Sequence, residues 1–160
     1  MIENERDIRH EQVLRAARQM MTAARTAPKG KGIDILEMAL IEGEEVRTLS
    51  ETMVAMVEEH GMKFFLRDHP QGLHRGHCGS ATCAGRTEGT PCALNSIDLG
   101  IAIGSACAMA ADLRLDTRVM FSAGLAAQRL GWLPGCRSVM AIPVSASSKN
   151  PFFDRKSPSV

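Results

Sequence analysis

Three of the five cysteines lie close together in one glycine-rich stretch of the sequence. Cys78 and Cys83 are separated by four residues, and Cys92 follows after eight more. Thiolates hold both iron–sulfur clusters and structural zinc, and both kinds of site normally take four ligands. The stretch 72–98 is therefore predicted to be a metal site that is one cysteine short.

Two histidines beside these cysteines offer a way to complete the ligand set. His74 and His77 lie within four residues of Cys78, and a neutral imidazole binds zinc well. One hypothesis is an iron–sulfur cluster on three thiolates, with His77 or His74 as a replacement ligand. A second is zinc bound by the three cysteines and one of these histidines, and a third is a set of thiols that holds no metal.

A second group of residues could hold a phosphate. Lys29 and Lys31 alternate with glycines, and Arg25 lies just before them. Ammonium groups and the amides of a glycine-rich turn can bind a phosphate such as that of FMN. The alternatives are a solvated turn and, for Arg25, an ion pair with an acidic side chain, because KGKG matches no phosphate-loop pattern.

The elements that position these residues are predicted from the spacing of apolar side chains. Steps of three and four residues predict helices over 7–26, 44–60 and 119–130, and a run rich in Gly and Ala predicts another over 97–113. Short apolar runs predict strands at 63–67 and 138–144. The run 33–41 fits a helix or a strand by pattern alone, and the glycines that bracket it, Gly32 and Gly43, favour a strand.

Several residues are expected to begin, end or pack these helices. Ser96 or Asp98 is the predicted cap of the helix 97–113, and Asp116 that of the helix 119–130. Gly100 and Gly104 lie one turn apart, which favours close approach of a neighbouring helix. We expect Pro28, Gly61 and Gly131 to lie at or just beyond the ends of their helices.

The order of these elements predicts one α+β domain over residues 1–160, with helices packed on a small sheet and the cysteine-rich loop inserted before the Gly/Ala helix. A polar tail over 146–160 carries Phe152 and Phe153. We expect these two rings to dock on the domain or on a second subunit.

Composition excludes some classes of partner. With 19 basic and 18 acidic side chains and 4% aromatic residues, the chain has no electrostatic footprint for nucleic acid or an anionic membrane. The charged amino terminus does not look like a secretory signal, and no run of 18 uninterrupted apolar residues occurs. We therefore expect a cytoplasmic protein, whose cysteines are thiols or metal ligands.

Six blocks of the sequence resemble, in order, a family of uncharacterised prokaryotic proteins that contain a ferredoxin domain. The blocks are residues 23–34, 64–68, 78–83, 91–106, 116–127 and 142–155. The resemblance implies a redox role, either electron transfer through an iron–sulfur cluster or support of a flavin reaction, together with a redox partner protein.

The cysteine block is also similar to the four-cysteine cluster domain of corrinoid iron–sulfur proteins and electron-transport subunits. That similarity puts Cys78, Cys83 and Cys92 on the last three ligands and Arg75 on the first. A guanidinium has no lone pair to offer a metal, and the approach from Asp68 to Arg75 is short beside the family pattern. The alternative function is therefore a non-catalytic binding or scaffold module that has lost its cluster.

Two of the blocks, AARTAPKGKGID and DLGIAIGSA, are further similar to the nitroreductase-like flavin fold. This similarity implies a homodimer with FMN bound between the subunits. It is an analogy of fold, and fold alone does not establish an activity.

Overall fold

The computed structural model describes residues 3–60 and 91–153. The elements, in chain order, are α1 (Glu5–Thr26), η1 (Gly30–Gly32), α2 (Glu44–His60), α3 (Ala93–Asp112), β1 (Asp116–Thr117), α4 (Phe121–Arg129) and β2 (Val144–Ser145). The described fold is mostly helical with one antiparallel two-stranded sheet, which agrees with the predicted α+β class.

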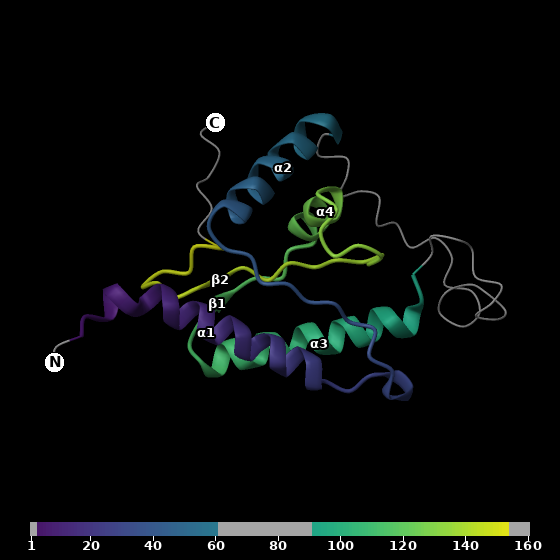
Figure 1. The fold of residues 1–160 in the computed structure, drawn as a ribbon, viewed down its shortest axis with the longest axis horizontal. Coiled ribbons are helices and arrows are strands. Elements are labelled where there is room, and N and C mark those ends of the chain that lie inside the picture. Colours follow the sequence, from purple (N-terminus) through teal and green to yellow (C-terminus); the bar gives the residue numbers. More distant parts are fainter. Residues whose placement is uncertain (1–2, 61–90, 154–160) are drawn as a thin grey trace.

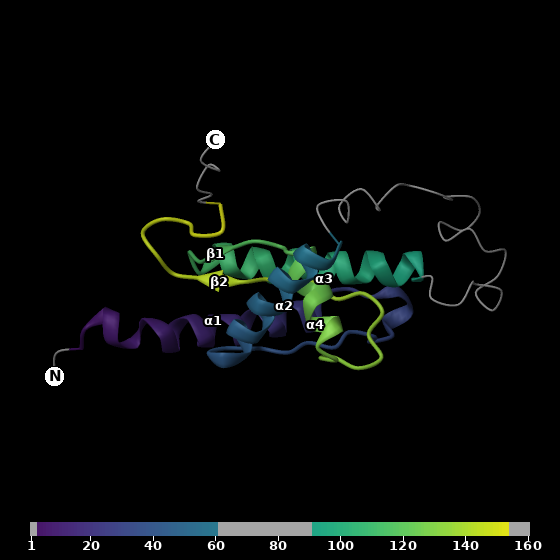
Figure 2. The same cartoon turned by 90° about the horizontal axis from the view of Figure 1, so that it is seen from above.

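Two long helices form the base of the molecule. Figures 1 and 2 show α1 and α3 lying side by side along much of their length. Their buried residues are mostly alanines, which let the two backbones come close, and Met20 and Leu36 fill the remaining space. The main core cluster is Met20, Ala24, Ala27, Leu36, Ala102, Ala106 and Ala110.

The predicted first helix is confirmed as α1. Asn4 caps its start, since the side-chain oxygen of Asn4 accepts a hydrogen bond from the Arg6 amide at 3.1 Å. The helix ends at Thr26, before Pro28. The predicted helix 44–60 is likewise confirmed as α2, which packs on α4.

The predicted start of the Gly/Ala helix is wrong. α3 begins at Ala93, with Cys92 in the N-cap position, so Ser96 and Asp98 lie inside the helix. The Ser96 amide continues the helical hydrogen bonding to the Cys92 carbonyl at 2.9 Å, and the Ser96 hydroxyl donates to the same oxygen. A serine can bond back to the preceding turn in this way, so a cap-type residue need not mark a helix start.

The predicted strand at 33–41 is also wrong. Only η1 interrupts the irregular chain between α1 and α2, and in the described residues this segment has no ladder partner, which a strand requires. Leu36 points into the core, whereas Ile33 and Ile35 are exposed. The apolar residues that suggested a strand therefore do not form one continuous buried face.

The C-terminal elements are shorter than predicted. α4 begins at Phe121 after Met120, while Asp116, the expected cap, belongs to β1. Gly131 follows the helix end with a φ of 73°, which confirms the predicted stop. Within the predicted strand 138–144, only Val144 is in β2, and an isolated bridge joins Ala141 to Met120.

The expected close approach at Gly100 and Gly104 is not seen within the described part of the chain, where a Cβ atom added at either position would have no neighbour within 4 Å. The close approach occurs at Gly124 of α4, where an added Cβ would collide with the carbonyl group of Val139. The sequence spacing placed two glycines on one side of a helix, but it did not show whether another element packs against that side.

The described part of the tail docks on its own domain. A guanidinium nitrogen of Arg118 donates a hydrogen bond to the Phe152 carbonyl at 2.8 Å. The central carbon of the same guanidinium group lies 5.0 Å from the centre of the Phe153 ring. A cation above an aromatic ring is attracted by the ring quadrupole. The predicted strand 63–67 and the expected cap at Gly61 lie outside the described residues.

Candidate functional site

Of the five predicted metal ligands, Cys92 is the one that lies among the described residues. It is half-buried and occupies the N-cap position of α3. The other four predicted ligands, His74, His77, Cys78 and Cys83, lie outside the described residues, as does Arg75.

The end of α3 at Cys92 is suited to negative charge. The first amides of a helix have no partners within the helix, and they carry the positive end of its dipole. α3 has no acidic side chain in its first turn, and the Cys92 side chain makes no capping hydrogen bond. A thiolate, or an anionic group held by thiolates, would be stabilised here.

The turn that contains Lys29 and Lys31 is fixed to the same helix. The Gly30 amide donates to the carboxylate of Asp98, at 3.0 Å from each of its oxygens. Asp98 is only 7% exposed, and it follows Cys92 by six residues, about 9 Å along the helix. Cys92 and the predicted phosphate-binding residues therefore belong to elements that contact each other.

The role of Asp98 was not predicted from the sequence, where it was considered only as a cap. A signal was available, because Asp98 is the one charged residue between Ala93 and Ala111. A carboxylate in a helix that is otherwise uncharged is costly to bury unless it has a hydrogen-bond partner. Gly30 supplies that partner, and an added Cβ at Gly30 would lie 3.4 Å from the carboxylate.

Arg25 and Lys29 are engaged with protein groups. Arg25 donates to Asp34 at 2.6 Å and to the Leu36 carbonyl at 2.7 Å, which is the ion-pair alternative considered from the sequence. Its hydrogen bond, followed by that of the Leu36 amide, lowers the pKa of Asp34 below its usual value.

The Lys29 ammonium donates to the carbonyls of Ala24, Arg25 and Ala27 at the end of α1. A cation there balances the negative end of the helix dipole. Lys31 lies in η1, and its side chain is outside the described atoms. The two described cations thus hold the turn together.

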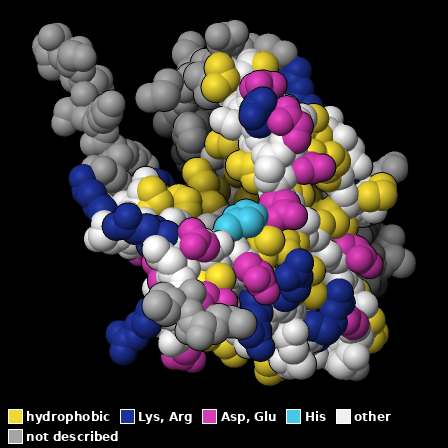
Figure 3. Space-filling model, turned by 60° about the vertical axis from the view of Figure 1, so that its left-hand side comes forward, with side chains coloured by type: hydrophobic (Ala, Val, Ile, Leu, Met, Phe, Trp, Pro, Cys, Tyr) yellow, Lys and Arg dark blue, Asp and Glu magenta, His cyan; other side chains and the backbone are white. Residues whose placement is uncertain are grey.

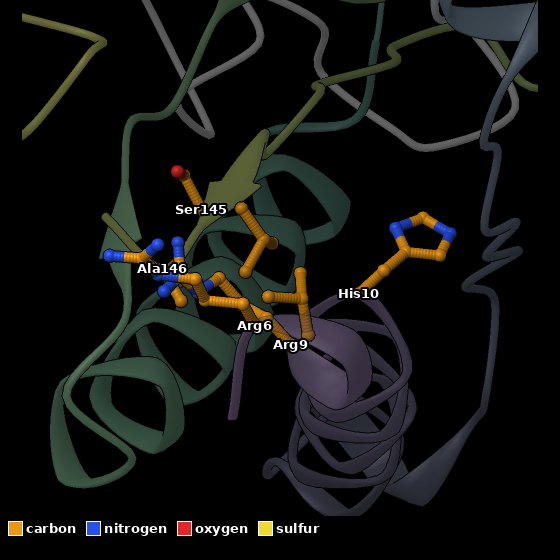
Figure 4. A pocket seen from close by; sticks show the side chains of 7 residues that line it. Arg6, Arg9, His10, Ser145 and Ala146 are labelled. Carbon is orange, nitrogen blue, oxygen red and sulfur yellow. The ribbon is translucent and has the colours of Figure 1, made fainter. Parts of the chain in front are cut away.

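A separate pocket of about 350 Å³ lies toward the other end of α1. Figure 4 shows Arg6 and Arg9 close to Ser145, while His10 lies farther from them. The full lining is Arg6, Arg9, His10, Val13, Val144, Ser145 and Ala146.

The charges around this pocket are largely balanced. Arg9 pairs with Glu5 at 2.6 Å, and His10 lies 3.2 Å from Glu42. The Arg9 hydrogen bond lowers the pKa of Glu5. Figure 3 shows basic and acidic side chains interspersed on the face that it presents. The pocket contains none of the residues singled out from the sequence.

Within residues 3–60 and 91–153, no three His, Cys, Asp or Glu side chains are grouped as a metal site. Cys107 and Cys136 are half-buried. One described helix, α3, is long and apolar enough to cross a bilayer by length and composition, and 22% of that stretch is buried. Such a helix is also typical of a protein core.

Comparison with known proteins identifies relatives of the chain. Residues 88–155 match the family described as "Uncharacterized protein containing a ferredoxin domain (DUF2148)". An uncharacterised protein of Archaeoglobus fulgidus is 37% identical over 182 residues, an alignment that covers 97% of this chain and 98% of that protein. No solved structure matches, so the nitroreductase-like part of the fold prediction has no support.

Proposed function

The chain belongs to the family of uncharacterised proteins that contain a ferredoxin domain, and from that premise we propose that it is a redox protein built around an iron–sulfur cluster. The observation that carries the proposal is the position of Cys92 at the N-terminal end of α3. When bound, the cluster would supply one-electron transfer at a tuned potential.

The described residues fit such a group at this point. Clusters held by thiolates are anionic, and hydrogen bonds from amides to their sulfur atoms tune their potential. The amides of the first turn of α3, which have no partner within the helix, are donors of this kind. Cys92 would hold the cluster together with Cys78 and Cys83, and with His74 or His77 as a further ligand.

Electron transfer through such a site needs no covalent catalysis. The protein would hold the cluster, exclude water from it and present it to a partner redox protein in the cytoplasm. The near balance of 19 basic and 18 acidic side chains gives no preference for a strongly charged partner.

The second candidate is a binding or scaffold module without a cluster, and Arg75 favours it. Arg75 stands where the resemblance places the first cysteine, and guanidinium cannot ligate. The alignment with the archaeal relative runs over 182 residues against the 160 of this chain, so the relative has positions that this chain lacks. A zinc site on the same residues is a further form of this candidate.

A flavin is the less supported cofactor. The predicted phosphate grip used Arg25, Lys29 and Lys31, but Arg25 and Lys29 bond to protein groups, and the Gly30 amide bonds to Asp98. Binding of FMN at this turn would have to displace these partners.

Elemental analysis of anaerobically purified protein tests the proposal. We expect iron and acid-labile sulfide in stoichiometric amounts, with a brown colour. One zinc atom per chain without iron would indicate the zinc form, and protein without metal and without visible absorption would contradict the redox function. Released FMN, measured by fluorescence, reports on the flavin alternative.

The change Arg75→Cys tests the assignment of the missing ligand. If position 75 is the first ligand position, this variant should take up more iron and sulfide on reconstitution than the unchanged protein. The matched control is Arg86→Cys, which adds a thiol to the same stretch at a position that the ligand pattern does not use. Equal uptake by the two variants would show that position 75 has no special role.

A further inference from the structure

The side of α3 that faces away from α1 is apolar and exposed. Leu94, Ile97 and Ile101 are 59%, 50% and 42% exposed. Four small residues continue the same face at steps of three and four residues, and all are exposed. The outer face of α3 is defined as Leu94, Ile97, Gly100, Ile101, Gly104, Ala108 and Ala111.

The large and small residues of the outer face are sorted along the helix. The three large side chains lie in the N-terminal half, and three of the four small residues, Gly104, Ala108 and Ala111, lie in the C-terminal half. If a second α3 runs antiparallel with a two-fold axis beside residues 102 and 103, Leu94 meets Ala111 of the partner subunit, Ile97 meets its Ala108, and Ile101 meets its Gly104. One register therefore sets each large residue against a small one, as an isologous interface requires.

The charges of the helix fit the same arrangement. Of the two charged side chains of α3, Asp98 is buried on the inner side, and Asp112 is exposed at the C-terminal end. Antiparallel pairing brings Asp112 and the negative end of one α3 to the positive end of the other, which has no acidic residue in its first turn. A parallel pair would instead place like ends together.

From this complementarity of shape and charge we propose that two copies of the chain pair through the outer faces of antiparallel α3 helices. The glycines without neighbours then have a role, because Gly104 leaves room for Ile101 of the partner subunit. The pairing rests on described residues alone, and the attraction between helix ends is that of the chain without the proposed cluster, whose negative charge would lie at the same end of α3.

The size of the face sets the strength of the dimer. α3 has 20 residues, so it is about 30 Å long. A single helix face of this length covers less than the roughly 800 Å² per partner of a standard stable interface. The dimer should therefore be reversible and should dissociate on dilution.

Sedimentation equilibrium over a range of protein concentrations tests the pairing. The unchanged chain is expected to shift from monomer to dimer as concentration rises. Gly104→Leu should remain monomeric, because the new side chain meets Ile101 of the partner subunit. Within one chain the same side chain has no neighbour to meet at its Cβ, and it replaces a helix-interior glycine. Circular dichroism should therefore show a folded variant.

Two further variants test the proposed register of the two α3 helices. The double change Ile101→Ala with Gly104→Leu restores a large residue opposite a small one, and it should restore the dimer. The matched control Ala55→Leu places the same side chain at an exposed position on α2 and should behave as the unchanged chain.

A chain that stays monomeric at all concentrations, or a Gly104→Leu variant that dimerises normally, would overturn the proposal. So would failure of the double variant to regain the dimer. Sedimentation of the monomer with phosphatidylcholine vesicles would then identify a bilayer as the occupant of the outer face.

Discussion

The two faces of α3 are built from similar residues but are used differently. The inner face has Ala102, Ala106 and Ala110, at most 5% exposed against α1 and its neighbours. The outer face has Gly100 and Gly104, where an added Cβ atom would have no neighbour within 4 Å among the described residues. Small residues at helical spacing therefore permit close packing but do not say on which side it occurs.

The two faces of α3 differ because other elements of the chain contact the inner face, not because the residues of the helix differ in size alone. Asp98 on the inner side is held by Gly30, and α1 supplies Met20 and Ala24 to the same core. No described element supplies such a partner to the outer face. Adding atoms to each kind of surface, or removing the contact that fixes the inner one, tests whether the two faces differ in this way.

The largest effect is expected for Gly124→Ala. Its new methyl group would collide with the Val139 carbonyl, a backbone atom that has little room to move. We expect a loss of about 3 kcal/mol in the free energy of unfolding, the upper range for overpacking. Urea unfolding followed by circular dichroism at a low, fixed protein concentration measures it.

The matched control is Gly104→Ala on the outer face, where the same methyl group meets nothing. It should raise the free energy of unfolding by up to about 1 kcal/mol, the difference in helix propensity. Equal losses at both positions would mean that the outer face is as crowded as the contact at Gly124.

A smaller effect is expected for Asp98→Ala on the inner face. The change leaves the Gly30 amide without its acceptor beside the core, which should cost about 1–3 kcal/mol of stability. Asp98→Asn keeps one acceptor oxygen and should cost less. If the alanine variant unfolds at the same urea concentration as the unchanged protein, Asp98 does not hold the turn to α3.

The smallest effect concerns the pair of Arg25 with Asp34, which is exposed. The Arg25 hydrogen bond lowers the pKa of Asp34, so any stability from this pair is present above the ordinary aspartate pKa and is lost as pH falls through the lowered value. Arg25→Gln should raise the pKa of Asp34 toward its ordinary value. NMR titration of the Asp34 carboxyl measures it, and Arg18→Gln on the same helix is the control that should change nothing.

Much of the helical framework could be predicted from sequence because it depends on local spacing. α1 and α2 follow their apolar periodicity, and Pro28 lies beyond the end of α1 as expected, whereas the Asn4 cap was not predicted. The segment 33–41 could not be predicted, because a strand needs a partner that local pattern does not reveal. Its conformation depends instead on Arg25, Asp34 and the burial of Leu36.

The candidate site stays a prediction in its residue types, and its geometry could not be predicted. Spacing suggested Cys92 as a ligand, whereas its position at the start of α3 became visible only when the helix proved longer than its apolar pattern. Lys29 and Arg25 were singled out by type, yet their partners lie on the backbone and on Asp34. Contacts of this kind depend on tertiary structure.

The central claim is that Cys92 holds a cluster at the end of α3, and a pair of serine variants on the same helix tests it most directly. Cys92→Ser and Cys107→Ser remove half-buried thiols, but only the first is a predicted ligand. After anaerobic purification, we predict that Cys92→Ser loses most of its bound iron and visible absorption, while Cys107→Ser retains both. Equal iron in the two variants, or none in the unchanged protein, would contradict the claim.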